Sequence, residues 1–524
     1  MILALDLGTS SARSALFDAR GNRIADSLRQ EQYQLRTAAD GTAELDPAVM
    51  LATVRRLLAD RRADGVGISC FWHSLLGCDA KGRPLTPIYT WADSRCTPDA
   101  AALRARCDER AVHARTGCML RASFWPAKLA WLRRTQPARF ARVSYWVGPA
   151  EWLLWQLTGE LRCAHGMATA TGLYDPARQT WDPGMLRTCR VRAEQLPPIS
   201  DAPLALPGLG AVFPAIGDGA ANNLGVGATK PGLAAINFGT SAAVRIVRER
   251  GIPRAPFGLF CYRIDQRRYL IGGAISNAGG LRAWCVDRLA LPAEEVLERE
   301  LAARPGPHPS LAVLPFWLAE RAPSWREDVS GTITGITQST TAIDLLQAIT
   351  EATYQRLATI VGLVPGRRDL RFLVGGGLQK SAASFQRLAD CIGAPLIAAD
   401  EPETSLRGAA VLALERLEKK PPPSEAVPSS LAPCTNGRMP SNAPDSLCSR
   451  PRFSGQPPTA NRQSPIATPC LPISPTALPP PFSARTTFAE RWSRPTARSA
   501  PAARCSQCPR TSPASTAGPG PSPA

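Results

Sequence analysis

An internal repeat constrains the fold of this chain more than any other feature of its sequence. The segment ALDLGTSSARSALF at residues 4–17 is similar to AINFGTSAAVRIV at residues 235–247. Each copy contains a short apolar strand, a Gly-Thr-Ser turn and a second strand, which predicts a β-hairpin with a turn of small residues. Two such hairpins far apart in the chain predict two duplicated α/β domains, each beginning at or near its hairpin.

Strand and helix patterns alternate through the rest of the first 418 residues. Apolar residues recur at helical spacing in some segments, and short apolar runs bounded by turn residues predict strands between them. The predicted helices are 47–59, 341–361, 381–393 and 405–417, and the predicted strands are 66–70, 371–377 and 395–399. This alternation predicts mixed or parallel sheets covered by helices.

The composition changes near Lys420. Residues 421–524 hold 24 of the 50 prolines, and such a stretch cannot bury enough apolar surface to offset the entropy lost on ordering. We therefore predict a first domain at 1–213, a second at 214–418 and a disordered tail at 419–524. A reading-frame shift in a GC-rich gene would give a similar composition and stays open as the origin of the tail.

The net charge of +18 does not indicate a nucleic-acid partner. About half of the excess of Lys and Arg follows residue 418, and no basic helix with interleaved aromatic residues precedes it. No apolar run approaches the roughly 18 residues of a membrane span. The start MILALDLGTSS also lacks the basic residues of a signal peptide. We expect a cytoplasmic protein that binds neither nucleic acid nor membrane.

The cysteines give no metal signal. Most of the 15 cysteines precede residue 419 without the spacing of metal ligands, as expected for buried thiols in a reducing compartment. Cys505 and Cys508 form a single CxxC with no second pair, which is a poor indication of zinc.

The first hairpin has the residues of a phosphate-binding loop. A strand brings Asp6 to its end, where the carboxylate is placed to hold Mg²⁺, and Gly8 allows a tight turn. Hydroxyl, backbone N–H and guanidinium groups follow that can bind phosphate. They belong to Thr9, Ser10, Ser11 and Arg13. An ordinary hairpin turn is the alternative, because Gly, Thr and Ser are common turn formers.

The second hairpin repeats this turn at Gly239 and Thr240, with Asn237 in the place of Asp6. Two phosphate loops that face each other across a cleft need one metal-binding carboxylate rather than two. The asymmetry therefore favours a nucleotide clamp over a purely structural duplication.

A third candidate is Asp218, which lies in a glycine turn within AIGDGAANNLGVGA at residues 215–228. A carboxylate here could accept the proton of an attacking hydroxyl, as a positioned base does in phosphoryl transfer. It could also cap the following helix, and the two roles are compatible because a helix N-terminus favours an ionised carboxylate.

These segments, in this order, resemble the FGGY carbohydrate kinases, two-domain enzymes with the actin-like, ribonuclease-H-like ATPase fold. The resemblance covers about residues 1–418 and implies ATP and Mg²⁺ as cofactors, Asp218 as catalytic base and an interdomain cleft. KLAWL at 128–132 and the segment 331–351 resemble the two family signatures, with departures at Trp125 and Thr350. The segments GGAISNAGGLRAW and VGGGLQKSAASFQRLAD resemble nucleotide-side motifs. They place Gly279, Gly376, Gly377 and Ser381 near ATP.

The run SCFWHSLLGCDAKGRPLTPIYTWADSR at residues 69–95 resembles the gluconokinase branch of the family. His73 matches a position that binds substrate in xylulokinases, next to Trp72 where a Met is typical, which implies that Trp72 and His73 bind substrate. Without the family resemblance, a structural role would suit His73 better. Trp91, Asp93 and Arg95 either line the sugar site or brace its loop, and Asp93 and Arg95 could simply pair with each other.

The expected reaction is phosphorylation of a small sugar or sugar acid, with D-gluconate giving 6-phospho-D-gluconate. A kinase for xylulose, another ketose or a polyol is one alternative, and an actin-like or chaperone-like ATPase without a sugar substrate is another. Gluconate differs from these sugars by its carboxylate, which should recruit an Arg or Lys that the sequence does not identify. A homodimer is a possible assembly.

Overall fold

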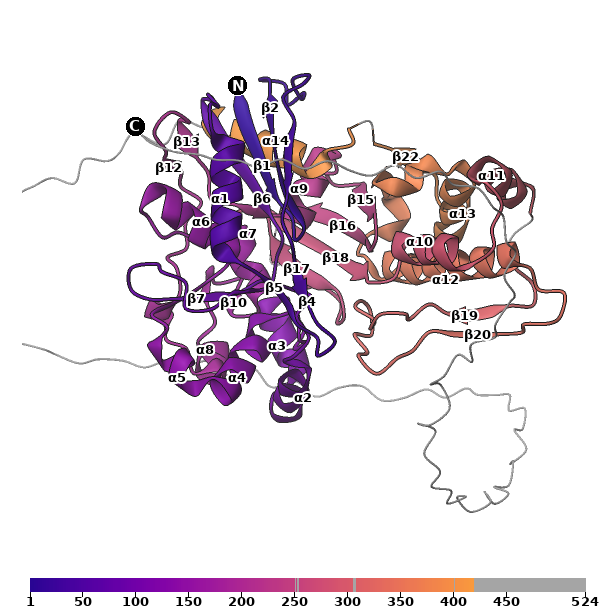
Figure 1. The fold of residues 1–524 in the computed structure, drawn as a ribbon, viewed down its shortest axis with the longest axis horizontal. Coiled ribbons are helices and arrows are strands. Elements are labelled where there is room, and N and C mark those ends of the chain that lie inside the picture. The colour runs from indigo at the N-terminus through magenta and orange to yellow at the C-terminus, as the bar shows by residue number, and fades with distance from the viewer. Residues whose placement is uncertain (250, 252–253, 305–307, 400, 419–524) are drawn as a thin grey trace, which may run out of the picture. The chain divides into compact units, whose positions relative to one another are not determined.

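The computed structural model describes residues 1–249, 251, 254–304, 308–399 and 401–418 (Figure 1). The predicted tail at 419–524, with Cys505 and Cys508, lies outside the described residues. Among the described residues, the ten cysteines are free thiols, and most of them are buried. No helix in the described part of the chain is long and apolar enough to cross a membrane.

The first hairpin forms as predicted and lies at the centre of a mixed sheet. Strand β1 pairs antiparallel with β2, so that Asp6 lies opposite Arg13, and it pairs parallel with β6 on its other side. The strand order is β12-β13-β6-β1-β2-β3, and β14 also pairs with β6. These strands are β1 (Ile2–Leu7), β2 (Ser11–Phe17), β3 (Arg29–Gln32), β6 (Gly65–Cys70), β12 (Leu204–Ala205), β13 (Ala211–Val212) and β14 (Ile216–Gly217).

The second hairpin occupies the same place in a second sheet, of order β17-β18-β16-β15-β21-β22. Strand β15 pairs antiparallel with β16 and parallel with β21, as β1 does with β2 and β6. The prediction of two α/β domains with a repeated hairpin is therefore confirmed. The strands are β15 (Leu233–Phe238), β16 (Ala242–Arg248), β17 (Phe260–Arg263), β18 (Tyr269–Ile275), β21 (Arg371–Gly375) and β22 (Leu396–Ala398).

Small two- and three-stranded sheets complete the β-structure of the described residues. They pair β4 (Arg36–Thr37), β5 (Ala43–Leu45) and β8 (Ile88–Tyr89); β7 (Leu76–Cys78) and β9 (Tyr145–Val147); β10 (Tyr174–Asp175) and β11 (Thr180–Trp181); and β19 (Ala312–Leu314) and β20 (Thr332–Thr334).

The helices follow from apolar spacing and from caps in the sequence. The hydroxyl of Thr341 accepts the amide N–H of Asp344 while the Asp344 carboxylate accepts the amide of Thr341, which caps α12. The first-half helices are α1 (Pro47–Leu58), α2 (Thr97–Arg106), α3 (Glu109–Thr116), α4 (Trp125–Thr135), α5 (Pro137–Arg142), α6 (Pro149–Thr158), α7 (His165–Ala168), α8 (Pro183–Cys189) and α9 (Asp218–Gly225). The later helices are α10 (Gly279–Arg288), α11 (Glu294–Ala303), α12 (Ala342–Leu363), α13 (Ala382–Ile392) and α14 (Thr404–Glu418).

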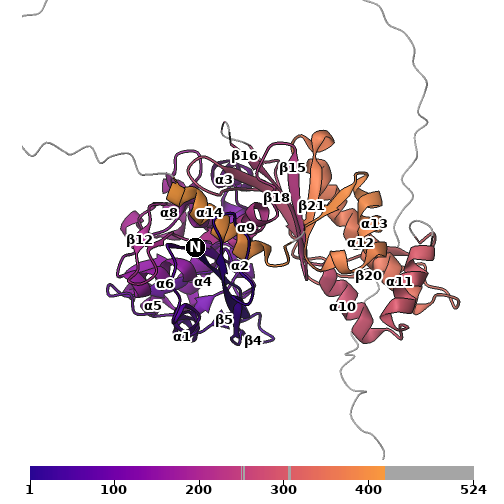
Figure 2. The same cartoon turned by 90° about the horizontal axis from the view of Figure 1, so that it is seen from above.

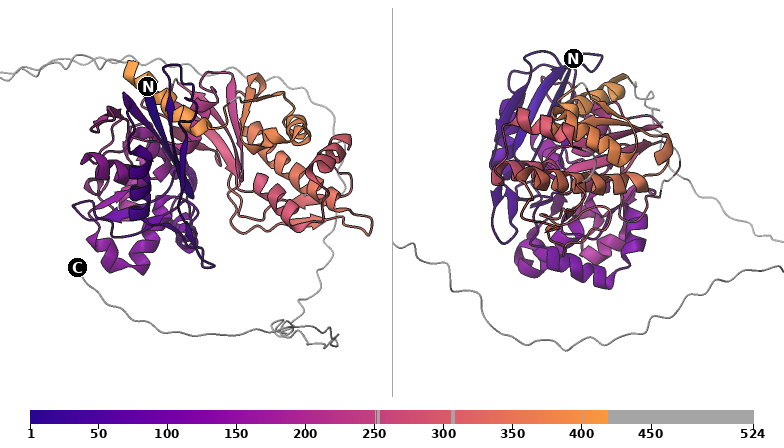
Figure 3. Two further views of the ribbon diagram at one scale, coloured as in Figure 1. Left: turned by 45° about the horizontal axis from the view of Figure 1, so that its top comes forward. Right: turned by 90° about the vertical axis from the view of Figure 1, so that its right-hand side faces the viewer.

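Helix α14 comes from the end of the predicted second domain but packs on the sheet of the first. Its apolar side joins residues of β1 and β2 in one buried cluster, and α14 also lies along α9 (Figures 1 and 2). Figure 3 shows this orange helix beside the indigo strands at the N-terminus. The chain therefore returns to its first sheet after completing the second.

Glycines allow this close packing of α14. A Cβ atom at Gly408 would lie 1.7 Å from the carbonyl oxygen of Ala221 on α9, and one at Gly67 on β6 would lie 2.1 Å from the carbonyl oxygen of Ala409. Because real Cβ atoms do not approach backbone so closely, these positions require glycine unless the helix shifts. The contact fixes α9, and with it the position of Asp218 at its first turn.

We expect Gly408→Ala to destabilise the protein by about 1–3 kcal/mol, because the added methyl group overpacks the contact between α9 and α14. The matched control is Gly362→Ala, at a helical glycine of α12 with open space around its Cβ position. There the substitution should stabilise by roughly 0.5–1 kcal/mol. Urea unfolding of both variants checks the prediction, and equal effects would contradict it.

Candidate active site

Residues of both halves of the chain line one small cavity, of about 170 Å³, which we call the Asp218 cavity. The first half contributes Trp72, His73, Trp91, Ser123 and Phe124. Asp218 also lines it; this residue lies just past the predicted boundary at 213, directly after strand β14 of the first sheet. The second half contributes Asn237, Ser241, Ala242, Ala243, Arg245, Phe260, Tyr262, Ala274, Arg321 and Trp325. The predicted base and both predicted substrate-binding residues therefore share one cavity, and their roles stay predictions.

Asp218 is the first residue of α9, directly after β14. Its Oδ1 accepts the backbone N–H of Gly219 at 2.7 Å, so the carboxyl also serves the helix start, as the sequence allowed. Burial raises the pKa of Asp218, whereas the nearby Arg245 guanidinium acts in the opposite direction. A carboxyl with a raised pKa is a stronger base once ionised, which suits proton abstraction from an alcohol.

The indole of Trp72 is packed against the backbone on both sides of Asp218. A Cβ atom at Gly217 would lie 1.7 Å from the indole ring, and one at Gly219 would lie 2.6 Å from it. The indole N–H donates to the carbonyl of Gly166 at 3.1 Å. Trp72 is only 6% exposed, so most of its surface contacts protein rather than the cavity.

His73 is held as a neutral hydrogen-bond acceptor. Burial lowers the pKa of His73 to about 3, so the ring is uncharged at neutral pH. Its Nδ1 lies 2.7 Å from the carbonyl oxygen of Ala170, which can only accept, so Nδ1 carries the proton and Nε2 has a free lone pair. The backbone of His73 has φ of 65°, which is uncommon outside glycine and places the ring at the cavity wall.

Two partly buried arginines form the positive side of the cavity. Nε and Nη1 of Arg245 on β16, and Nε of Arg321, are buried without a hydrogen-bond partner among the described residues. Arg321 donates from Nη2 to the carbonyl of Ile275 at 2.9 Å, and its guanidinium lies 5.8 Å from the ring of Trp91. Burial and the neighbouring Arg245 lower the pKa of Arg321 to about 10, so it is still charged at neutral pH.

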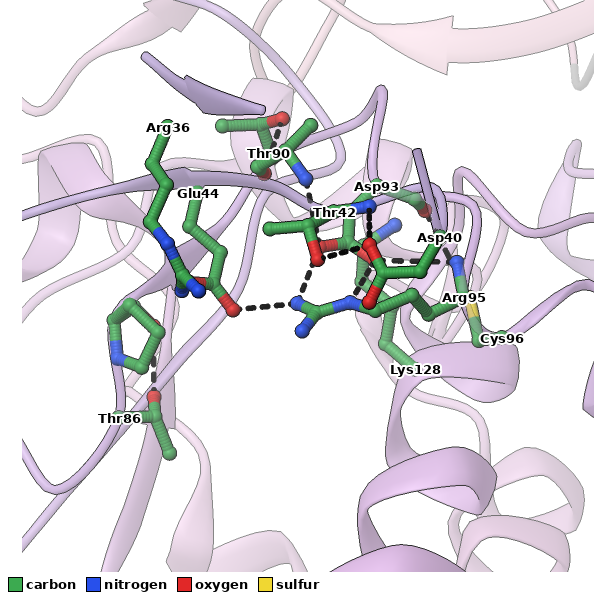
Figure 4. Close-up of polar contacts among 12 residues, drawn as sticks. Arg36, Asp40, Thr42, Glu44, Thr86, Thr90, Asp93, Arg95, Cys96 and Lys128 are labelled. Carbon is green, nitrogen blue, oxygen red and sulfur yellow. Dashed lines mark hydrogen bonds and ion pairs between the residues drawn. The ribbon is translucent and has the colours of Figure 1, made fainter. Parts of the chain in front are cut away.

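Asp93 and Arg95 brace the loop that carries Trp91. The Arg95 guanidinium donates to Asp93 at 3.1 and 2.6 Å and to Glu44 at 2.5 Å (Figure 4). It also lies over the ring of Trp131. Neither Asp93 nor Arg95 lines the Asp218 cavity, whereas Trp91 does. Of the two alternatives left open by the sequence, the structure shows the pairing of Asp93 with Arg95.

The buried ammonium of Lys128, which Figure 4 places beside this network, orders a second wall of the cavity. It donates to the carbonyls of Ala122 at 2.7 Å and Ser123 at 2.9 Å, and Ser123 lines the cavity.

A second cavity, of about 460 Å³, lies entirely within the second half of the chain, and we call it the Gly239 cavity. Five of the predicted nucleotide-binding residues line it, namely Gly239, Thr240, Gly279, Gly377 and Ser381. Helix α10 begins here, and the amide of Gly279 donates to the carbonyl of Gly239 at 2.9 Å. Small residues, backbone amides and a helix N-terminus together make a site suited to phosphate groups.

Gly376 supports this cavity from behind, since it does not line it. Its φ is 97°, and a Cβ atom there would lie 2.6 Å from the carbonyl oxygen of Phe238, at the end of β15. The hydroxyl of Ser381 donates to the carboxylate of Glu298 at 2.8 Å and accepts the amide of Ser384 at 3.1 Å, which caps α13.

The first phosphate loop lines neither cavity. Thr9, Ser10 and Ser11 are partly or fully exposed at the tip of the first hairpin. Arg13 forms an ion pair with Glu403 at 2.9 Å, directly before α14. The predicted phosphate contacts of these four residues stay predictions, and Arg13 would have to leave Glu403 to make one.

Asp6 lies deep in the first hairpin, within electrostatic range of Asp218. Burial raises the pKa of Asp6 to about 6, and the charge of Asp218 adds to the shift. The two acids belong to one electrostatic site although they come from β1 and α9.

Two family models match this chain. The model of the N-terminal domain of the FGGY family of carbohydrate kinases matches residues 1–206, and that of the C-terminal domain matches residues 234–415. The chain belongs to the FGGY family of carbohydrate kinases. As an FGGY kinase it is a phosphotransferase that acts on sugars, and kinases of this family use ATP.

Relatives of this FGGY kinase differ in the substrates that their names give. The gluconokinase of Bacillus subtilis (strain 168) is 27% identical over 450 residues, which cover 79% of this chain and 87% of that protein. The glycerol kinase of Rhodospirillum centenum is 30% identical over 450 residues, which cover 79% of this chain and 88% of that protein.

Solved structures with a similar fold are likewise named for different substrates. A ligand-bound xylulose kinase from Lactobacillus acidophilus has a TM-score of 0.75, and a gluconate kinase from the same organism has 0.73, each at 25% identity and covering 80% of this chain and 89% of the other. The fold also matches a Plasmodium falciparum glycerol kinase solved with ADP, with a TM-score of 0.71 and 19% identity over 80% of this chain and 89% of that one. These similarities leave the sugar of this FGGY kinase unresolved.

Sequence reasoning missed the two arginines of the Asp218 cavity. Arg245 carried a signal, because it is the one charged residue within the otherwise apolar segment AAVRIV of a repeated strand. Arg321 carried none, because it lies in a long connection between β19 and β20 whose path depends on tertiary contacts.

If Arg13 binds a phosphate of ATP during turnover, Glu403 competes for it. We expect Glu403→Gln to lower KM for ATP about two- to fivefold, since the loss of a part-exposed ion pair frees the guanidinium. KM for the sugar should not change. Steady-state kinetics with each substrate varied in turn checks this, and a raised or unchanged KM for ATP would show that Arg13 has only a structural role.

Proposed function

We propose that this FGGY kinase transfers the γ-phosphoryl group of ATP to the terminal hydroxyl of a sugar acid, with D-gluconate as substrate and 6-phospho-D-gluconate as product. The observation that carries this proposal is the charge of the Asp218 cavity. Two partly buried arginines, Arg245 and Arg321, line this cavity with a single carboxyl, Asp218, and His73 is neutral.

Buried charge needs a partner. An uncompensated cation in a cavity of low dielectric is costly, and three guanidinium nitrogens here have no hydrogen-bond partner among the described residues. A substrate carboxylate would supply both the missing charge and the missing acceptors, and carboxylates match the donor geometry of guanidinium. A neutral ketose or polyol would leave the positive charge in excess.

The remaining walls suit the polyhydroxy chain of such an acid. The Nε2 lone pair of His73 can accept a hydrogen bond from a sugar hydroxyl, and the rings of Trp91, Phe260 and Trp325 offer apolar faces for C–H groups.

Asp218 would act as the general base. It accepts the proton of the terminal hydroxyl as that oxygen attacks the γ-phosphorus, the bond to the β,γ-bridging oxygen breaks, and ADP leaves. The Gly239 cavity would hold the nucleotide, with Gly239 and Gly279 offering walls without side chains and Gly377 and Ser381 further along the cavity. Phe238 and Thr240 line the Gly239 cavity, whereas Asn237 and Ser241 line the Asp218 cavity, so the turn at Gly239 lies between the two cavities.

Asp6 and Asp218 fit a magnesium ion. Asp218 is exposed to the cavity that it lines, and Asp6 is half-buried. The charge of Asp218 raises the pKa of Asp6, so a bound cation would stabilise the ionised pair. No group of three or more His, Cys, Asp or Glu side chains in the described part of the chain could hold a metal. Phosphate oxygens and water would therefore supply the other ligands, and Mg²⁺ would neutralise phosphate charge.

The assignment of Asp218 predicts that Asp218→Asn lowers kcat about 10²–10⁴-fold, because the amide cannot take up the proton. The affinity for ATP, measured by calorimetry, should stay within a few-fold, because Asp218 does not line the Gly239 cavity. Near-normal turnover in this variant would rule out the role.

The proposed role of the arginines predicts that Arg321→Met loses activity toward gluconate more than activity toward neutral sugars. Because a charge-assisted pair is lost, kcat/KM for gluconate should fall about 10- to 100-fold, and that for xylulose or glycerol much less. Arg326→Met is the matched control, since Arg326 pairs with Asp328 at the surface, at 2.7 Å. A coupled ADP assay over a panel of sugar acids, ketoses and polyols gives the answer. A wild-type preference for neutral sugars would overturn the choice of substrate, and ATP hydrolysis indifferent to every sugar would favour an ATPase module.

A further inference from the structure

The segment at residues 320–327 brings Arg321 and Trp325 to the Asp218 cavity, and it belongs to the second half of the chain, between β19 and β20. Contacts within that half hold it at several points. The amide of Ala322 donates to the carbonyl of Ala274 at 3.0 Å, and the indole N–H of Trp325 donates to the carbonyl of Gly258 at 2.7 Å. These contacts secure the segment to its own domain.

Two arginines of the first half hold the same segment from the other side. Nε of Arg121 donates to the carbonyl of Trp325 at 2.9 Å, and Nη2 of Arg104 on α2 donates to the carboxylate of Glu327 at 3.0 Å. Each arginine also donates from Nη1 to the carbonyl of Leu120 at 2.8 Å.

Leu120, whose carbonyl accepts from both arginines, lies close in sequence to residues of the opposite wall of the cavity. Ser123 and Phe124, a few residues after Leu120, line the Asp218 cavity, and the ring of Phe124 lies 5.9 Å from that of Trp325. One network of hydrogen bonds therefore fixes two walls from different domains relative to each other, with the Arg321 guanidinium on one of them.

We propose that Arg104 and Arg121 are positioning residues for substrate recognition, which act through Glu327 and the Trp325 carbonyl to hold Arg321 and Trp325 against the first-domain wall. This proposal rests on the proposed function, because it takes the molecule bound in the Asp218 cavity to be a sugar or sugar acid. Without these contacts the segment keeps its own-domain anchors, so the protein folds but the cavity widens. The loss should therefore appear in sugar binding rather than in the chemical step.

The test uses the pair Arg104–Glu327, whose side chains are 27% and 21% exposed, because Arg121 is more deeply buried. Arg104→Met and Glu327→Gln should each raise KM for gluconate about fivefold, while KM for ATP and kcat stay within twofold. The double variant should lose little more than either single one, because both remove the same interaction. Arg104→Lys should recover part of the loss.

Arg106→Met is the matched control, since Arg106 lies on the same helix and, among the residues that the structure describes, its side chain donates to the carbonyl of Ala102 in its own helix and to no residue of the other domain. An unchanged KM in the single variants, additive effects in the double variant, or an equal rise in the control would overturn the proposal. So would a fall in kcat and a rise in KM for ATP of the same size, which would indicate a general structural role.

The same measurements separate this proposal from the choice of substrate. If the wild type prefers a neutral sugar, the choice of gluconate is wrong, and a selective rise in KM for that sugar still supports the positioning role. Calorimetry with gluconate, xylulose and glycerol measures binding independently of turnover. If the wild type binds and phosphorylates none of them, both proposals are wrong.

Discussion

The position of Asp218 depends on backbone contacts that a side chain would prevent. Helix α9 touches α14 at Gly225 and Gly408, where Cβ atoms would lie 1.8 and 1.7 Å from carbonyl oxygens of the facing element. At its start, the indole of Trp72 covers Gly217 and Gly219 on either side of the acid. Asp218 is thus fixed through its helix, and its carboxyl needs few hydrogen bonds of its own. This leaves oxygen lone pairs for a substrate proton.

Burial on both sides of the cavity has opposite electrostatic consequences. It raises the pKa values of Asp6 and Asp218 and lowers those of Arg245 and Arg321, so each group alone is disfavoured in its charged form. The groups partly compensate one another, but the arginine side still lacks acceptors. Ligands that bring an anion to the arginines and a cation to the acids would complete the balance, and this complementarity underlies the proposal of a sugar acid with Mg²⁺.

Apolar spacing and turn residues predicted most of the fold, because hairpins and helices, and where they begin and end, depend on residues that are close in sequence. Both Gly-Thr-Ser turns formed because apolar strands flank them, and α12 begins within one residue of the start that apolar spacing predicts at 341. The packing of α14 on the first sheet could not be predicted, because its apolar residues suit either sheet equally. The ion pair of Arg13 with Glu403 could not be predicted either, because it joins residues at opposite ends of the described chain. Arg321 depends on tertiary contacts of a connection without regular structure.

The two cavities divide the recognition of substrates unequally between the domains. The Gly239 cavity is built from one domain alone, from a turn, helix starts and glycines, which are features that the repeat and local motifs encode. The Asp218 cavity needs both domains and takes Arg321, Trp325 and Trp91 from connecting segments. Because such segments vary without disturbing a sheet, substrate choice in this architecture can change while the phosphate-handling turns are retained. Family membership therefore determines the phosphoryl donor more securely than the acceptor, whose identity we propose to depend on a few side chains such as Arg245 and Arg321.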